Sequence, residues 1–208
     1  MQFCDRLLLE NRAWSDEMRG RDPDFFSRLQ HGQAPEALWI GCSDSRVPPE
    51  QLCNAAPGNL FIHRNVANLV ASRDTGFMSV LEYAVVQLGV PHIVVCGHHG
   101  CGGVAAACAA DSTGLVHVED HIESLRALHL YHRDTLTGIA DEGDRVDRLV
   151  ELNVIAQIDA LAALPVVRNA PKPPQLHGLV YGTDSGRLSL LCNRDAEPAS
   201  RVASALSA

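Results

Sequence analysis

The sequence predicts an α/β fold: a mostly parallel central sheet with an antiparallel edge strand and flanking helices. Short apolar stretches alternate with longer stretches of helical periodicity, which is typical of parallel sheets covered by helices. Near the end of the chain, two apolar stretches flank the turn Asp184-Ser185-Gly186, which predicts a closing hairpin. With 208 residues, 46% of them apolar, the chain is long enough to bury a proper core.

The chain is expected to form a single domain over residues 1–208 with three parts. Residues 1–35 form an N-terminal helical arm, residues 36–193 an α/β core, and residues 194–208 a C-terminal tail. The helices of the arm have no evident place in a parallel sheet. We therefore expect them to pack on a partner subunit.

Individual elements follow from periodicity and from the residues that end them. Apolar stretches predict strands at 37–41, 60–63, 91–96, 176–181 and 188–192. The third of these is rich in β-branched residues, as expected in the middle of a parallel sheet. Helical periodicity predicts helices at 5–19, 24–30, 75–88, 102–110, 118–129 and 144–164. Gly89 is a plausible end for the helix at 75–88, and residues 169–174 predict a proline-rich loop.

Composition excludes several classes of function. A net charge of −8 argues against nucleic acid as a partner, because phosphate binding needs clustered Lys and Arg. No stretch approaches the roughly 20 apolar residues that a membrane span needs. The first ten residues lack the features of a secretory signal, so we expect a cytoplasmic protein without a membrane partner.

Seven cysteines are an odd number for a cytoplasmic chain, which favours metal-binding or catalytic cysteines over a disulfide framework. Cys96, Cys108 and Cys192 lie in apolar or alanine-rich stretches and are expected to be small buried hydrophobic residues. Cys4 and Cys53 are also expected to be inert. Two cysteines, at 42 and 101, remain for chemistry.

These two cysteines belong to loops that directly follow predicted strands. Cys42 and Asp44 follow the first strand, and His98 and Cys101 follow the third. Open α/β sheets place their ligand sites at the carboxyl ends of parallel strands, so the two loops meet if the strands are neighbours. Thiolate, imidazole and carboxylate are ligand types that zinc prefers, and four of them satisfy a tetrahedral ion. His99 could compete with His98, but the spacing to Cys101 favours His98.

Arg46, two residues after Asp44, indicates a catalytic site. If Arg46 pairs with Asp44, the carboxylate leaves the metal and a water takes its place. Loss of a proton then gives zinc-bound hydroxide, a nucleophile. A structural zinc site with four permanent ligands is the main alternative of another class. A thiol redox protein is disfavoured because the sequence has no C-x-x-C, and a nucleotide site because residues 97–103 lack the required glycine spacing and lysine.

With these motifs in view, the sequence resembles the β-class carbonic anhydrases from about residue 11 to residue 193. Four segments carry the resemblance: residues 42–47, 61–68, 79–85 and 97–103. The resemblance implies reversible hydration of carbon dioxide to bicarbonate and a proton, with one Zn²⁺ per chain. It implies Cys42, His98 and Cys101 as permanent ligands, and Asp44 and Arg46 as a catalytic dyad. It also implies a homodimer that can pair into a homotetramer.

The resemblance further implies two groups of residues around the metal. A subset of the family binds bicarbonate at a second site and thereby stabilises a resting form in which the aspartate ligates zinc. The residues that match this subset, and imply allosteric inhibition by bicarbonate, are Trp39, Gly41, Val47, Glu50, Arg64 and Tyr181. The implied substrate pocket, part of it contributed across the subunit interface, comprises Gln33, Phe61, Val66, Tyr83, Leu88, Gly102 and Gly103. Hydrolysis of carbon disulfide or carbonyl sulfide on the same scaffold is the alternative reaction.

Overall fold

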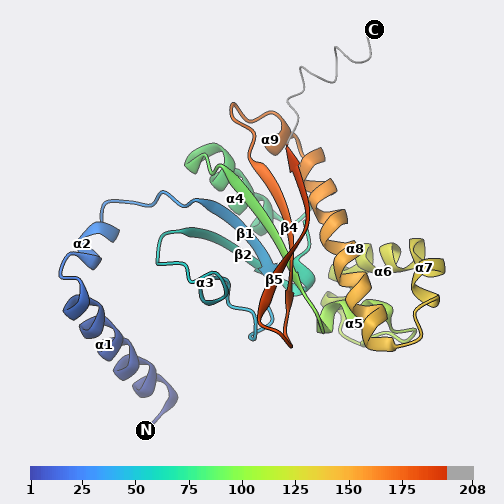
Figure 1. Cartoon of the computed structure of the whole chain (residues 1–208), viewed down its shortest axis with the longest axis horizontal. Helices are drawn as coiled ribbons and strands as arrows, with labels where there is room; N and C mark the ends of the chain where they lie inside the picture. The colour runs from blue at the N-terminus through green and yellow to red at the C-terminus, as the bar shows by residue number, and fades with distance from the viewer. Residues whose placement is uncertain (196–208) are drawn as a thin grey trace. The chain divides into compact units, whose positions relative to one another are not determined.

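The computed structural model describes residues 1–195 and divides into two compact units, Met1–Ala34 and the chain from Pro35 onward (Figure 1). The division falls one residue before the predicted end of the helical arm. The tail predicted from residue 194 starts within the last strand, and its residues 196–208 lie outside the described part of the chain.

The first unit consists of α1 (Phe3–Arg21) and α2 (Phe25–Leu29). The ring of Trp14 packs edge-on against Phe25 and Phe26, with centroids 6.2 and 5.7 Å apart, and so holds the two helices together. No residue of the 19 in α1 is buried. A helix that leaves all of its apolar side chains accessible is consistent with the predicted packing on a partner, which stays a prediction.

The second unit is built on one five-stranded sheet, in the order β2-β1-β3-β4-β5. Its strands are β1 (Ala37–Cys42), β2 (Leu60–Asn65), β3 (His92–His98), β4 (Gln175–Gly182) and β5 (Arg187–Asp195). The first four are mutually parallel, and β5 runs antiparallel to β4 at the edge. The predicted fold class is therefore confirmed, and each predicted strand is present.

Strand ends differ from the predicted ones in a way that matters for function. The strands β1 and β3 run on to Cys42 and His98, beyond the apolar stretches that predicted them. Pairing with a neighbouring strand sets these ends, and hydropathy does not report it. Pro91 lies outside β3, where its carbonyl still accepts a hydrogen bond from the Gln175 N–H.

Helices cover the sheet and gather at its carboxyl end. Three helices lie close to their predicted ranges: α5 (Gly102–Cys108), α6 (Val116–Tyr131) and α8 (Glu142–Ala163). Helix α8 lies along β3 and β4, and α5, α6 and α7 gather around its first turns (Figure 1). Four short helices were not predicted from periodicity, since each spans little more than one turn: α3 (Pro49–Leu52), η1 (Val66–Asn68), α7 (Arg133–Thr137) and α9 (Pro165–Arg168).

The helix predicted at 75–88 consists of an α-helical part followed by a π-helical part. The α-helical part, α4 (Thr75–Glu82), begins where the Asp74 side chain accepts the N–H groups of Gly76 and Phe77. It continues as a π-helical segment, η2 (Tyr83–Leu88), and ends at Gly89 with φ 63°, as the glycine predicted. A π-helical segment shifts the register of the apolar face, which the helical period alone does not anticipate.

Two clusters of buried apolar side chains form the core. The first joins the sheet to α4 and α8 through side chains such as Leu81, Ile93 and Ile158, each fully buried. Each such side chain contributes about 1.5–3 kcal/mol on burial. The second joins α5, α6, α7 and α8, and it also encloses Cys42 and Cys101. No helix within residues 1–195 has both the length and the apolar character needed to cross a bilayer.

Candidate metal centre

Three of the predicted ligands converge at the carboxyl edge of the sheet. Cys42 ends β1, His98 ends β3, and Cys101 immediately precedes α5. Because β1 and β3 are adjacent and parallel, their ends meet. The sulfur atoms and a ring nitrogen of His98 all lie within 4.8 Å of one another, and the three residues are 6%, 1% and 1% exposed.

The chemistry of this cluster fits zinc. The Nδ1 atom of His98 lies 3.1 Å from the His99 carbonyl oxygen and can donate to it, which leaves Nε2 free to accept. His98 Nε2 is buried without a hydrogen-bond partner within the described part of the chain. A buried acceptor facing two sulfurs 3.8 Å apart is the donor set of a Cys/His zinc site.

Hydrogen bonds from the backbone prepare the sulfurs to carry charge. Cys42 accepts from the N–H groups of Asp44 and Ala67, and Cys101 from those of Gly103 and Val104. The Cys101 thiol bonds to Cys42 and, against the effect of burial, lowers the pKa of Cys42 to about 4. The same bond and burial raise the pKa of Cys101. The pair therefore shares one proton, which a divalent cation would displace.

The third member of the cluster also responds to the sulfurs. Burial lowers the pKa of His98, but the nearby Cys42 sulfur, the His99 carbonyl oxygen and the charge of Asp44 raise it further, so that the net direction is upward. The surroundings of the His98 ring therefore favour a positive charge there. A bound metal ion would supply that charge as well as a proton on the imidazole would.

Asp44 lies beside the cluster, bound to Arg46. The guanidinium donates from Nε to Oδ1 at 2.9 Å and from Nη2 to Oδ2 at 2.7 Å, and the backbone N–H of Arg46 adds a bond of 2.9 Å. These bonds hold the pKa of the Asp44 carboxyl well below its usual range. Asp44 Oδ2 is 3.8 Å from His98 Nε2. The carboxylate is thus near the metal position but paired with arginine, and its role as fourth ligand stays a prediction.

The residues predicted for bicarbonate regulation lie around β1 and its loop. Trp39 is 3% exposed, and a Cβ atom on Gly41 would lie 2.7 Å from its Nε1, so the glycine leaves room for the indole. Arg64 donates to the carbonyl oxygens of Cys42 (2.8 Å) and Asp44 (2.6 Å). Val47 is buried, Tyr181 is half-buried on β4, and Glu50 is exposed on α3.

The residues predicted for the substrate pocket form two contacts. The rings of Phe61 and Tyr83 stack with centroids 5.7 Å apart. The backbone of Gly103 approaches Val66, because a Cβ atom on Gly103 would lie 2.6 Å from Val66 Cγ1. The remaining members are Leu88, which packs against the first core cluster, Gly102, which opens α5, and Gln33, which belongs to the first unit and is exposed there. The pocket itself stays a prediction.

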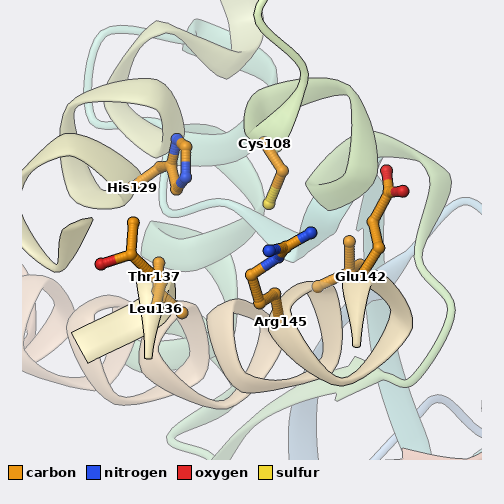
Figure 2. A pocket seen from close by; sticks show the side chains of 7 residues that line it. Cys108, His129, Leu136, Thr137, Glu142 and Arg145 are labelled. Carbon is orange, nitrogen blue, oxygen red and sulfur yellow. The ribbon is translucent and has the colours of Figure 1, made fainter. Parts of the chain in front are cut away.

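A cavity of about 200 Å³ lies between α5, α6, α7 and α8 (Figure 2), and none of the predicted site residues lines it. Its walls include Cys108, Leu136 and Arg145. Burial raises the pKa of the Cys108 thiol, which keeps it protonated and unreactive. All seven cysteines are free, as the absence of a disulfide framework requires.

Sequence reasoning missed the polar residues of α8 that support the site. Asn153, fully buried, donates to the Ala67 carbonyl oxygen at 3.0 Å and accepts from Gln157 at 2.9 Å. Ala67 and Asn68 have φ of 62° and 50°, a left-handed conformation that needs such external support. An asparagine within the apolar stripe of a predicted helix was the available signal.

Comparison with known proteins adds independent findings. A family model described as carbonic anhydrase matches residues 37–188. A curated carbonic anhydrase of Emericella nidulans is 42% identical over 190 residues, covering 90% of this chain and 82% of the relative. A tetrameric β-carbonic anhydrase of Sordaria macrospora superposes with a TM-score of 0.88 at 40% identity, covering 91% of this chain and 98% of that one. A Coccomyxa β-carbonic anhydrase, solved with acetazolamide, gives 0.89 at 37% identity, covering 98% and 92%.

Proposed function

Because this chain belongs to the β-class carbonic anhydrases, which are zinc enzymes, we propose that it hydrates carbon dioxide reversibly at the Cys42, His98 and Cys101 cluster. The observation that carries the assignment is the Nε2 of His98, which is buried, faces two sulfurs and has no hydrogen-bond partner among residues 1–195. When bound, the metal supplies the Lewis acidity that makes water a nucleophile near neutral pH. One zinc ion per chain follows from the single such cluster found within residues 1–195.

The role proposed for Asp44 is to orient the attacking water. Arg46 fixes both carboxylate oxygens, so Asp44 can accept a hydrogen bond from water without binding the metal itself. Holding the lone pair of the nucleophile toward a small apolar substrate lowers the barrier by positioning. The carboxylate stays ionised over the working range, because its pKa is lowered, and remains an acceptor throughout.

The same dyad gives the proposed switch. If Asp44 leaves Arg46 and becomes a fourth ligand, the site closes to water. Bicarbonate bound near Trp39, Arg64 and Tyr181 would favour this form. Support comes from Arg64, which donates to the carbonyl oxygens on either side of Ser43 and thereby couples the position of its guanidinium to the loop that carries Asp44. A ligand shifts such an equilibrium only by its differential affinity for the two forms.

Bicarbonate inhibition tests the switch directly. The wild type is expected to be inhibited most strongly at the acid end of its pH range. A Trp39→Phe, Tyr181→Phe double variant is expected to lose most of this inhibition. Equal inhibition of the double variant and the wild type would contradict the regulatory site while leaving the hydration activity intact.

A homo-oligomer, dimer or tetramer, is proposed for the same chain. The Sordaria relatives are described as tetrameric, and α1 presents no buried residue within its own unit. Light scattering of the full chain, compared with a variant that lacks residues 1–34, measures the contribution of α1 and α2 together. A monomer in both cases would contradict the proposal. A cytoplasmic location stays a prediction of the sequence.

Stopped-flow hydration of carbon dioxide by zinc-loaded protein, from pH 6.5 to 9, tests the main proposal. We expect activity that rises with pH, because two thiolate ligands make a bound water less acidic than three imidazoles would. Zinc-loaded protein that is inactive at every pH would favour a structural zinc site. Carbon disulfide and carbonyl sulfide, assayed in parallel, would identify the alternative reaction.

A further inference from the structure

We infer that Asp147, on α8, is a positioning residue of the metal centre that acts through the backbone of Gly100. The carboxylate accepts the Gly100 N–H at 2.8 Å from Oδ1. It is the only side chain in the described part of the chain recorded as accepting from this loop's backbone between His98 and Cys101. The inference rests on the proposed function, because it gives Asp147 a part in the Asp44 switch.

The peptide between His99 and Gly100 is held on both sides. Its N–H donates to Asp147, and its carbonyl oxygen accepts from Thr183 Oγ1 at 3.3 Å and lies 3.1 Å from His98 Nδ1. A peptide unit is planar, so fixing its N–H fixes the direction of its carbonyl. That carbonyl orients the His98 ring and leaves Nε2 aimed at the sulfurs.

The peptide that follows Gly100 links Asp147 to the pair formed by Asp44 and Arg46. The Gly100 carbonyl oxygen accepts from Arg46 Nη2 at 3.2 Å, and the same nitrogen donates to Asp44 at 2.7 Å. Gly100 has φ of 66°, a left-handed conformation that a glycine adopts and leaves readily. Anchoring its N–H to α8 keeps its carbonyl in place for Arg46. Without the anchor, the hold of Arg46 on Asp44 should weaken, and Asp44 should occupy the metal for a larger fraction of time.

Helix α8 offers a matched control one turn further on. Glu151 also approaches His99, with its carboxylate 4.0 Å from Nε2, as Asp147 approaches Nδ1 at 3.9 Å. The two side chains are similarly exposed, 33% for Asp147 and 28% for Glu151. Glu151, however, is bound by Arg148 at 2.6 Å and, within the described part of the chain, makes no hydrogen bond to the loop backbone. A role that came from charge near His99 would therefore appear at both positions.

The test is azide binding to the full-length protein loaded with cobalt(II), read from the visible spectrum of the metal. Azide binds only where Asp44 does not occupy the metal, so its apparent affinity reports the open fraction. At the acid end of the pH range, where the proposed switch places Asp44 on the metal for most of the time, we expect Asp147→Ala to raise the azide Kd about five- to tenfold, the size of one lost hydrogen bond. Asp147→Asn keeps an acceptor oxygen and should stay within about twofold of the wild type, as should Glu151→Gln.

A double-mutant cycle shows whether Asp147 acts through Asp44. In an Asp44→Asn background no carboxylate competes for the metal, so adding Asp147→Ala should leave the azide Kd unchanged. An equal loss in both backgrounds would overturn the inference. So would wild-type affinity in Asp147→Ala, or a loss in Asp147→Asn as large as in Asp147→Ala.

Two further experimental outcomes can be distinguished from those above. If Asp147→Ala does not fold, Asp147→Ser, whose hydroxyl is too short to reach Gly100, replaces it with the same expectation and the same contradicting result. If cobalt-loaded wild type binds no azide at any pH, the open site of the proposed function fails, and the inference falls with it.

Discussion

Two regions of the second unit contain the same four kinds of side chain, a thiol, an imidazole, a carboxylate and a guanidinium. At the metal centre they are Cys42, His98, Asp44 and Arg46, and around the cavity of Figure 2 they are Cys108, His129, Glu142 and Arg145. Within the described residues, three ligand atoms come within 4.8 Å of one another only at the first.

The difference lies in the backbone that carries them. The first set comes from strand ends and loops whose peptide groups are bonded to the sulfurs, to Arg46 and to α8. The second comes from three separate helices, and among the described residues the Arg145 side chain makes only a 3.4 Å bond to the Ile139 carbonyl. The outcome is opposite for the thiols: the pKa of Cys42 is lowered to about 4, whereas burial raises that of Cys108. The same kinds of side chain therefore form a candidate reactive site only where hydrogen bonds to the backbone hold them in place. Around the cavity they are not held in this way.

Replacing one thiol in each region should give the largest contrast. Cys42→Ser should reduce bound zinc to well below one per chain and hydration by more than about a thousandfold, because a zinc ligand is lost. Cys108→Ser should change neither by more than about twofold. Metal analysis and stopped-flow hydration measure the two effects, and a zinc-replete, active Cys42→Ser protein would contradict the assignment.

Replacing one arginine in each region should give the next contrast. Arg46→Ala should lower kcat/KM for hydration about ten- to hundredfold, since Asp44 then loses its partner and is free to close the site. Arg145→Ala should leave kcat/KM within about twofold. Zinc content should stay near one in both variants. Loss of zinc in Arg46→Ala would show a structural role instead.

The ionisation of the two thiols should differ as their environments do. After removal of zinc with a chelator, alkylation of Cys42 should already be at its plateau at pH 7, because its pKa is lowered to about 4 and the thiolate predominates. Alkylation of Cys108 should still rise with pH above 9, because its pKa is raised. At pH 7 the thiolate fractions should differ by more than about thirtyfold. Mass spectrometry of labelled peptides over pH 5–10 checks this, and parallel profiles would contradict it.

Glycine substitutions should give the smallest effect on hydration and a clear one on stability. A Cβ atom on Gly97 would lie 2.8 and 2.9 Å from methyl groups of Val154 and Val150 on α8. Gly97→Ala should therefore lower the free energy of unfolding by about 1–3 kcal/mol. Gly138→Ala, beside the cavity, meets only an ordinary 3.5 Å contact and should cost less than about 0.5 kcal/mol. Equal denaturant midpoints would show that β3 and α8 are not tightly packed there.

How far sequence reasoning reached depends on the range of the interactions. The strands and the proposed ligands Cys42, His98 and Cys101 follow from local pattern: an apolar stretch, a polar loop and a glycine-rich turn. The sequence alone did not show whether β1 and β3 are neighbours, and the strand order of the sheet shows that they are. The turn of η2 has no local signature at all, because the same periodicity suits an α-helix.

The supporting contacts of the site could not be predicted for a related reason. Asp147 bonds a residue 47 positions away, and Asn153 one 86 positions away. In the sequence of a predicted helix, each of these is simply a polar residue. The spacing of residues does not show which partner the side chain bonds or which way it points. In the proposed switch, the choice of Asp44 between Arg46 and the metal is likewise a balance between two states, which residue types alone do not decide.

The separation of the ligands along the chain has a consequence for folding. Cys42 and Cys101 are 59 residues apart, so an ion that joins them closes a long loop in any form of the chain that retains both ligands. Closing such a loop reduces the conformational entropy of the unfolded chain, as a disulfide does. An ion that binds the native site more tightly than the unfolded chain also stabilises the fold by mass action. Zinc bound at the proposed site would therefore stabilise the fold as well as supply the chemistry, and the free zinc concentration should affect the folded fraction as well as the rate of turnover.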